Sequence, residues 1–230
     1  MDRLYFDTVI VGGGPAGSSC ALTLQKHGFT SCIIDRHKFP REKLCAGLLT
    51  AKSRLLLKKL FPDIDMRTFY EATGCTETPA FKLFDKGKPI IDININPSFV
   101  LTERYRFDNF LIQSYKKLGG NVLEERSVRK ADFAKRLLTL DDGSTVGYHH
   151  LVAADGANSF ISRACGKGRP GNAVCVETNI SRDDLRVGGV CAYFNVVPKS
   201  YAWAFTKGDH INVGMIKLPD ATFNLKETFC

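Results

Sequence analysis

Residues 7–35 have the sequence DTVIVGGGPAGSSCALTLQKHGFTSCIID, and this stretch decides the fold that we predict for the chain. It opens with a β-branched run, residues 7–11, which is typical of a buried parallel strand. A glycine-rich turn follows, then a helical segment at residues 18–27 that ends at Gly28. A second strand, residues 32–35, ends in a carboxylate. This order of strand, turn, helix, strand and acid predicts a dinucleotide-binding unit of the Rossmann type.

The spacing of the glycines has a physical basis. Gly12 permits a tight turn, Gly14 lets a pyrophosphate approach the backbone, and Gly17 lets the helix pack closely on the strand. The helix N-terminus then offers unpaired amides and a partial positive charge. The predicted pyrophosphate-binding residues are Gly12, Gly13, Gly14, Pro15, Ala16 and Gly17.

Asp35 lies close to the offset of about 20 residues at which an acid binds a ribose hydroxyl. The alternative is a glycine-rich turn in some other α/β protein, with Asp35 as a solvated strand end. The presence of both strands and the acid favours the dinucleotide site.

The composition is that of an ordinary globular protein. The chain has 230 residues, of which 44% are hydrophobic and 24% charged, and this length suits one or two domains. It contains no apolar run long enough to span a membrane and no signal peptide. None of its eight cysteines forms a CxxC pair, so we predict reduced thiols, no metal site and a cytoplasmic location.

The formal net charge is +8, but most basic residues are scattered along the chain. A cluster follows Asp35 directly, and a nearby cofactor phosphate explains it more simply than DNA does, so we predict no nucleic-acid partner. A solvated basic loop is the alternative. The cluster consists of Arg36, His37, Lys38, Arg41 and Lys43.

The rest of the chain alternates between helical and strand patterns. We predict helices at residues 48–60 and 104–118, a hairpin at 80–95, and strand-like segments at 121–128, at 136–148 with a turn at 141–144, and at 149–154. Further strands follow from 187 to 218, and the start of a helix at 222–229.

Three aromatic residues, Tyr201, Trp203 and Phe205, alternate along one of these strands and therefore point to one face. Ile211, Val213 and Met215 show the same alternation on the next strand. Such an apolar wall suits a substrate cavity and equally suits an ordinary sheet core.

Several motifs together resemble the geranylgeranyl reductase family of FAD-dependent oxidoreductases, which has the p-hydroxybenzoate hydroxylase fold. The resemblance covers about residues 5–216. The motifs are GGGPAG, Arg41-x-Lys43-x-Cys45-x-Gly47, Arg104-x-x-Phe107-Asp108, Asp155-Gly156-x-x-Ser159 and Tyr201-x-Trp203-x-Phe205.

The resemblance implies an α/β fold in which a Rossmann-like FAD-binding domain with a parallel sheet is interleaved with an antiparallel β substrate domain. The FAD-binding domain would comprise residues 1–60 and 98–168, and the substrate domain residues 61–97 and 169–230.

The resemblance also implies roles for individual residues toward FAD. The glycine turn would hold the pyrophosphate and Asp35 the adenosine ribose. The backbone of Val128 would lie near the adenine, and Asp155 would meet the ribityl–pyrophosphate region. The aromatic strand would line the substrate cavity. The other implied cofactor-binding residues are Arg36, Arg41, Lys43, Cys45, Ala46, Gly47, Arg104 and Gly156.

The chain departs from the family pattern at three places. Ala46 stands where the family usually has glycine, and Arg163 lies one position beyond the usual arginine, where Ser162 stands instead. The chain also ends before a further glycine–aspartate segment that holds the flavin end of FAD. We therefore expect a C-terminally truncated protein.

The implied activity is the reduction of carbon–carbon double bonds in isoprenoid chains, with an electron donor that the sequence does not identify. An isoprenoid substrate is consistent with peripheral membrane contact. One alternative is a flavin monooxygenase on the same fold, and another is a non-catalytic remnant. Cys45 is either a redox group beside the flavin or a small buried hydrophobe.

Overall fold

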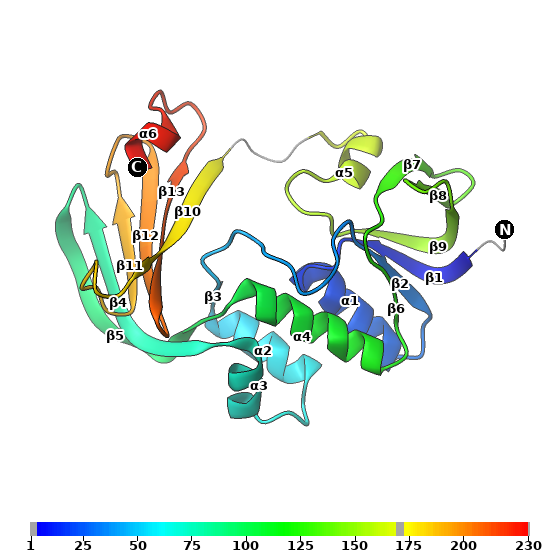
Figure 1. Ribbon diagram of the computed structural model, residues 1–230, viewed down its shortest axis with the longest axis horizontal. Helices are drawn as coiled ribbons and strands as arrows, with labels where there is room; N and C mark the ends of the chain where they lie inside the picture. Colours follow the sequence, from blue (N-terminus) through cyan, green and yellow to red (C-terminus); the bar gives the residue numbers. More distant parts are fainter. Residues whose placement is uncertain (1–3, 169–172, 230) are drawn as a thin grey trace. The chain divides into compact units, whose positions relative to one another are not determined.

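The computed structural model describes residues 4–168 and 173–229, and the chain forms two compact units (Figure 1). The first unit comprises residues 1–42 and 105–170, and the second comprises residues 43–104 and 171–230. Residues 169–172, where the predicted substrate domain resumes, and Cys230 lie outside the described residues.

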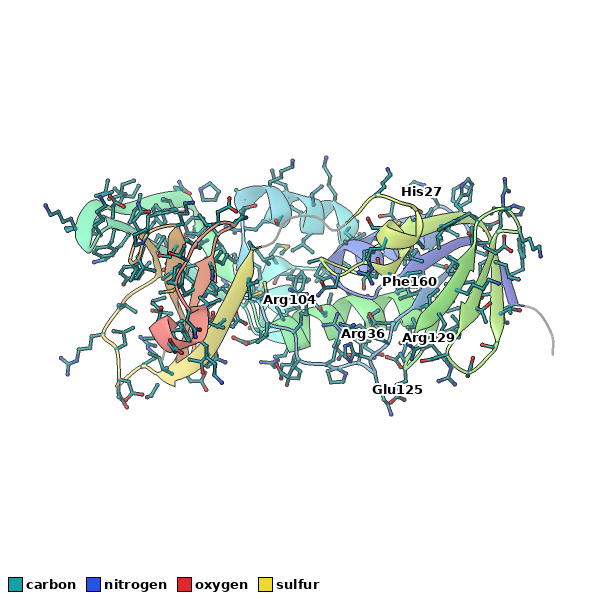
Figure 2. The ribbon with its side chains drawn as sticks, turned by 90° about the horizontal axis from the view of Figure 1, so that it is seen from above. His27, Arg36, Arg104, Glu125, Arg129 and Phe160 are labelled. Carbon is teal, nitrogen blue, oxygen red and sulfur yellow. The ribbon has the colours of Figure 1, made fainter. Side chains whose placement is uncertain are left out.

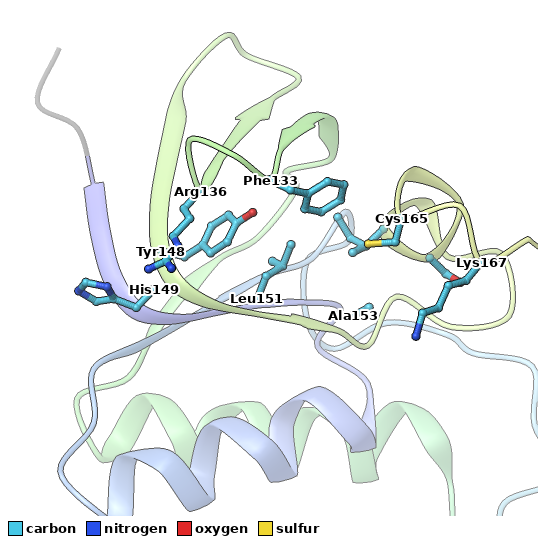
Figure 3. Close-up of a pocket in the computed structure, with 10 residues that line it drawn as sticks. Phe133, Arg136, Tyr148, His149, Leu151, Ala153, Cys165 and Lys167 are labelled. Atoms are coloured by element: carbon cyan, nitrogen blue, oxygen red, sulfur yellow. The ribbon is translucent and has the colours of Figure 1, made fainter.

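The first unit is built on a six-stranded sheet with helices α1 and α4 packed on one face (Figure 3). The strands are β1 (Leu4–Val11), β2 (Ser31–Ile34), β6 (Asn121–Leu123), β7 (Val128–Asp132), β8 (Leu137–Leu140) and β9 (Thr145–Ala153), and the helices are α1 (Pro15–Lys26), α4 (Arg104–Lys117) and α5 (Phe160–Ala164). The strand order is β6-β2-β1-β9-β8-β7. Strands β6, β2, β1 and β9 are parallel, whereas β8 and β7 continue the sheet antiparallel.

The predicted strand–turn–helix–strand unit is present in this sheet. Val9, Ile10 and Ile33 are fully buried, as expected for central parallel strands. Pro15 begins α1 because its missing amide costs nothing at a first helical position. The strand pattern predicted at 136–148, with its turn at 141–144, forms β8 and the start of β9. The separate strand predicted at 149–154 is instead the continuation of β9.

The second unit is built on a seven-stranded sheet in the order β10-β13-β12-β11-β4-β5-β3. The strands are β3 (Leu48–Leu49), β4 (Thr76–Asp85), β5 (Lys88–Leu101), β10 (Val174–Ser181), β11 (Val190–Phe194), β12 (Ser200–Lys207) and β13 (His210–Lys217), and the helices are α2 (Ala51–Leu60), α3 (Met66–Thr73) and α6 (Leu225–Phe229). All neighbours are antiparallel except β11 and β4. The predicted fold class, α/β with a parallel and an antiparallel part, is confirmed.

Three elements of the second unit differ from the sequence prediction. Leu48 and Leu49 pair with β5 as a short strand, so α2 begins only after Thr50, whose side chain accepts a hydrogen bond from the Ser53 amide. Helix α3 was not predicted, although Asp65 caps its start and Gly74 ends it in a left-handed conformation. Strand β10 was not predicted either.

The aromatic residues of β12 lie on one face, as predicted, and Trp203 and Phe205 share a buried cluster with Leu101 and Val190. Ile211, Val213 and Met215, which alternate in the same way on β13, do not lie on this face. The register pairs Tyr201 with Ile216, Trp203 with Gly214 and Phe205 with Asn212, so the other set faces the opposite side. This register follows from the tight turn between β12 and β13, because a shift of one residue would invert the face.

Trp203 occupies the space that a side chain at position 214 would take. A Cβ atom on Gly214 would overlap the indole ring, whose Nε1 donates a hydrogen bond to Asn212 Oδ1 at 2.8 Å. Gly214 therefore provides the space in which the largest side chain of the aromatic face lies flat on the sheet.

We expect the substitution Gly214→Ala to destabilise the protein by about 1–3 kcal/mol, because the added methyl group overpacks the indole site. The matched control is Gly208→Ala, where no atom lies within 4 Å of the new Cβ and a change within about 0.5 kcal/mol is expected. Urea unfolding measures both variants. Equal stabilities would contradict this packing.

Candidate cofactor site

The glycine turn of the first unit is a place where two backbone segments approach too closely for side chains. Gly12 has a φ of +104°, and a Cβ there would overlap the Ala154 carbonyl. A Cβ on Gly17 would overlap the carbonyl oxygen of Gly12. These contacts bring the start of α1 against the carboxyl ends of β1 and β9, which is the edge where ligands bind in open α/β sheets.

Asp35, which directly follows β2, holds this turn in place through hydrogen bonds of its carboxylate. Its carboxylate accepts a hydrogen bond from the Gly13 amide at 2.7 Å and another from the His37 amide at 2.9 Å. The side chain is buried, but an ionised carboxylate has about four acceptor positions. Asp35 therefore keeps acceptor capacity for a ribose hydroxyl, and that predicted contact stays a prediction.

The N-terminus of α1 faces the turn without a side-chain cap. Gly14 is the N-cap residue, and its carbonyl accepts a hydrogen bond from the Ser18 amide at 2.9 Å. The first amides of a helix have no acceptor within the helix, and the helix dipole adds a partial positive charge. This end of α1 can therefore bind an anion.

The guanidinium of Arg41 lies beside the same turn. Its Nη1 is 3.2 Å from Oδ2 of the fully buried Asp108, and its Cζ lies 4.8 Å from the centre of the Phe39 ring. Nη1 is buried and makes no well-aligned hydrogen bond to any described residue. Nη2 stands 3.8 Å from the position that a Cβ on Gly14 would occupy. The ion pair thus holds a cation next to the N-terminus of α1.

These features fit the diphosphate of FAD. The space next to Gly14 is open, since no other atom comes within 4 Å of its Cβ position, whereas Gly12 and Gly17 are closed by backbone. Amide donors, a partial positive charge and a guanidinium are the groups that bind phosphate oxygens.

Asp155 has partners within its own turn. Its carboxylate accepts hydrogen bonds from the Ser159 hydroxyl and from the Phe160 amide at 2.7 Å, so it caps the start of α5. Gly156 has a φ of +81° in this turn. Arg163, the displaced arginine of this motif, donates to the Asn158 carbonyl at 2.8 Å. The implied contact of Asp155 with the cofactor stays a prediction.

The segment that leads to Val128 runs past Asp35. The Asp35 amide donates to the Leu123 carbonyl, and its carbonyl accepts from the Arg126 amide, both at 3.0 Å. Arg36 follows β2, and Arg129 lies on β7 in the same unit (Figure 2). The structure therefore brings the predicted ribose and adenine residues into one region of the first unit.

The loop at residues 43–47 belongs to the second unit, where it is tied to the sheet at two points. The Cys45 amide donates to Glu177 Oε1 at 2.6 Å, and the Thr102 amide donates to the Gly47 carbonyl at 2.9 Å. Gly47 has a φ of +78°, and a Cβ there would overlap the Thr102 carbonyl. Ala46 packs against the aromatic cluster of β12.

Several residues that were predicted to bind the cofactor lie near the carboxyl group of Glu177. Burial raises the pKa of its carboxyl above the usual range, and the Cys45 hydrogen bond together with the charges of Lys207, Lys43 and Arg104 opposes the rise. The structure therefore brings Lys43, Cys45 and Arg104 close to Glu177. Cys45 is exposed in this structure, and its predicted place beside the flavin stays a prediction.

Sequence reasoning missed Glu177 and Lys207. Lys207 is buried, donates to the Thr102 carbonyl at 3.1 Å and pairs with Glu103 at 3.3 Å. Lys207 lies two residues after Phe205, so the alternation along this strand could have placed it on the same face as the aromatic residues. Nothing in the sequence marks Glu177.

Neither a metal-binding cluster nor a membrane-spanning helix is present among the described residues, 4–168 and 173–229. These residues contain no group of three His, Cys, Asp or Glu side chains placed to bind a metal ion. None of their helices is long and apolar enough to cross a membrane.

A profile of the FAD-binding domain family matches residues 5–192. The chain belongs to this family. The predicted cofactor, FAD, is thereby confirmed at the level of the family, and the individual contacts stay predictions.

The chain is also similar to individual proteins of known name or structure. A geranylgeranyl diphosphate reductase from a Synechocystis species is 28% identical over 89% of this chain and 53% of its own length. A geranylgeranyl bacteriochlorophyll reductase-like protein from Thermoplasma acidophilum has a TM-score of 0.81 at 21% identity, over 98% of this chain and 60% of its own. The predicted resemblance to geranylgeranyl reductases is confirmed.

A probable FAD-dependent monooxygenase from Pseudomonas aeruginosa, pqsL, shares the fold with a TM-score of 0.71 at 14% identity, over 98% of this chain and 62% of its own. The chain spans about half the length of the curated relatives it matches, such as 53% and 55% of two of them.

Gly14→Ala and Gly17→Ala are expected to separate cofactor binding from folding. Gly14 has a φ of −69° and open space, so alanine there should change stability within about 0.5 kcal/mol but weaken FAD binding about tenfold or more. Gly17→Ala should destabilise the fold itself, because its Cβ meets backbone. FAD titration and urea unfolding measure the two effects. Unchanged FAD affinity in a folded Gly14→Ala variant would contradict the site.

The raised pKa of Glu177 predicts a pH dependence of stability. The pKa of the Glu177 carboxyl is higher in the folded than in the unfolded protein. Its contribution to the free energy of unfolding is therefore complete below the unfolded pKa and is lost as the pH rises through the folded pKa. The wild type should therefore lose stability relative to Glu177→Gln as the pH rises above 4.5, the usual value for this group. The control is Glu71→Gln, at an exposed residue of α3, which should follow the wild type. If the free energies of unfolding of the wild type and Glu177→Gln change in parallel with pH, burial of Glu177 does not cause a pH dependence of stability.

Proposed function

We propose that this protein uses FAD to reduce carbon–carbon double bonds of isoprenoid chains. In this proposal the first unit binds the diphosphate through the glycine turn and Arg41, and the aromatic face of the second unit binds the apolar chain. The names of the reductase relatives support the substrate class, because they describe enzymes that act on geranylgeranyl compounds.

One observation carries the proposal: Ala46 packs against the cluster that contains Trp203 and Phe205. Ala46 lies in the loop that, by family resemblance, runs beside the flavin, and the two aromatic residues lie in the motif that lines the substrate cavity. Within the second unit, these two motifs meet although they are far apart in the sequence. A substrate on the aromatic face would therefore lie against the loop that is proposed to contact the cofactor.

The aromatic face also changes from buried to exposed along its length. Ring centres lie 6.4 Å apart between Phe205 and Trp203, 6.0 Å between Trp203 and Tyr201, and 5.1 Å between Tyr201 and Phe194. Phe205 is 4% exposed, whereas Phe194 is 43% exposed. A linear apolar ligand would extend this row at its exposed end and remove apolar surface from water.

The chemistry divides between the cofactor and the protein. Reduced FAD, when bound, supplies a hydride for one alkene carbon, and a proton goes to the other carbon. The amides at the start of α1 and the Arg41 guanidinium would hold the diphosphate and so fix the position of the cofactor. The side chains of the aromatic face would orient the alkene and exclude water.

The test is anaerobic reoxidation of the FAD-loaded, chemically reduced protein on mixing with geranylgeranyl diphosphate. We expect reoxidation that depends on the prenyl compound, and none with the fully saturated analogue. Phe194→Ala should raise about tenfold the concentration of the prenyl compound that gives half-maximal reoxidation rate, because it removes aromatic surface from the exposed end of the row. Val196→Ala, at a residue that is 50% exposed and outside the row, is the control.

Two results would contradict the proposal. One is a reduced protein that is stable with the prenyl compound and reacts only with oxygen, through an accumulating peroxyflavin. That result would favour the monooxygenase alternative. The other is a folded protein that binds FAD but does not respond to either electron acceptor, as expected of a non-catalytic remnant.

A further inference from the structure

The first unit contains a cavity that no part of the proposed function uses. It has a volume of about 370 Å³ and lies between β9, α5 and the turn before β8. Figure 3 shows its side chains on the face of the sheet opposite to α1 and α4. The size falls within the range of small-molecule sites, about 300–1,000 Å³.

The hydroxyl of Tyr148 is the unusual group in this cavity. Tyr148 is 4% exposed, and its hydroxyl is buried without a hydrogen-bond partner among the described residues. Figure 3 shows the hydroxyl pointing from β9 toward Phe133, across the cavity. Buried hydroxyls nearly always have a partner, because an unpaired one loses its hydrogen bonds to water. A ligand in the cavity would supply the missing partner.

The charges around the cavity favour an anionic partner. Arg136 and Lys167 line it, and neither forms an ion pair with a described residue. No Asp or Glu is among the lining residues, and Asp132, whose charge acts on Tyr148, is paired with Lys135 at 3.9 Å. Burial raises the pKa of Tyr148, so its hydroxyl stays protonated and can donate a hydrogen bond to an anion.

The remaining walls of the cavity are mostly apolar. Phe133 is 39% exposed, whereas Ile161 is 3% exposed and Leu151 is half-buried. A ligand that covered Phe133 and Leu151 would remove apolar surface from water on both sides. Apolar walls with a few placed polar groups are typical of sites for small organic molecules.

We propose that this cavity is a binding site for a small organic anion, that is, a compact apolar body with one anionic group. The anionic group accepts the hydrogen bond of Tyr148, and the apolar body lies against Phe133 and Leu151. Arg136 and Lys167 lie at the two ends of the cavity and add positive charge to its rim. This site is separate from the proposed FAD and isoprenoid sites and does not depend on either.

The chain provides its own reporter for this site. Cys165 is an exposed free thiol that lines the cavity, and Cys175 is an exposed free thiol in the second unit. A ligand in the cavity should slow alkylation of Cys165 and leave Cys175 unchanged. Iodoacetamide treatment of the folded chain, followed by digestion and peptide mass spectrometry, measures the two rates separately in one sample.

The probes are 2-naphthoate, its neutral analogue 2-naphthylmethanol, and geranyl phosphate. We expect at least one of the two anions, at up to 1–2 millimolar, to slow Cys165 alkylation at least about fivefold, and the neutral analogue to have little effect. Protection by 2-naphthoate indicates an aromatic carboxylate as the ligand, and protection by geranyl phosphate alone indicates a linear phosphate. If neither anion protects Cys165, the proposal is wrong.

The variant Tyr148→Phe tests the role of the hydroxyl. It should weaken anion binding about tenfold and leave the ligand-free protein as stable as the wild type or more stable, because it removes an unpaired buried group. Arg136→Gln should weaken binding as well. The matched control is Lys135→Gln, which removes a neighbouring charge at a residue that is outside the lining and pairs with Asp132. Equal affinities in Tyr148→Phe and Lys135→Gln would overturn the proposed contact.

Discussion

The close approach of backbone to backbone at Gly12 and Gly17 is the constraint on which the first unit depends. A side chain at either position would overlap a carbonyl group, of Ala154 in one case and of Gly12 in the other. This approach sets the start of α1 against the ends of β1 and β9. The neighbouring Asp35 carboxylate then fixes the turn through the Gly13 amide. The anion-binding properties of the helix N-terminus follow from this geometry.

A similar constraint organises the second unit. Gly47 contacts the Thr102 backbone so closely that only glycine fits, and the loop before it is held through Cys45 and Glu177. Because the loop is fixed in this way, Ala46 lies on the aromatic cluster of β12. In each unit, a glycine at a position where no side chain would fit therefore allows a loop to lie against the end of a sheet.

The sequence was sufficient where the signals are local. The β1–α1–β2 unit could be predicted because glycine spacing, Pro15 and the apolar strands all lie within one short stretch. The sequence was insufficient where the outcome depends on register or on partners far along the chain. The alternation of apolar residues at 211–215 was evident in the sequence, but the turn before them decides which face of the sheet they occupy. The pairings of Arg41 with Asp108 and of Cys45 with Glu177, and the unpaired hydroxyl of Tyr148, arise only from the folded arrangement.

The central claim is that amides at the start of α1 bind the diphosphate of FAD. The most direct measurement is an amide NMR titration of the ¹⁵N-labelled chain with FAD and, separately, with riboflavin, which lacks the diphosphate. We predict that the amide signals of Gly14, Ala16 and Gly17 shift with FAD and stay in place with riboflavin. Signals that stay in place with FAD, or that shift equally with riboflavin, would contradict the account.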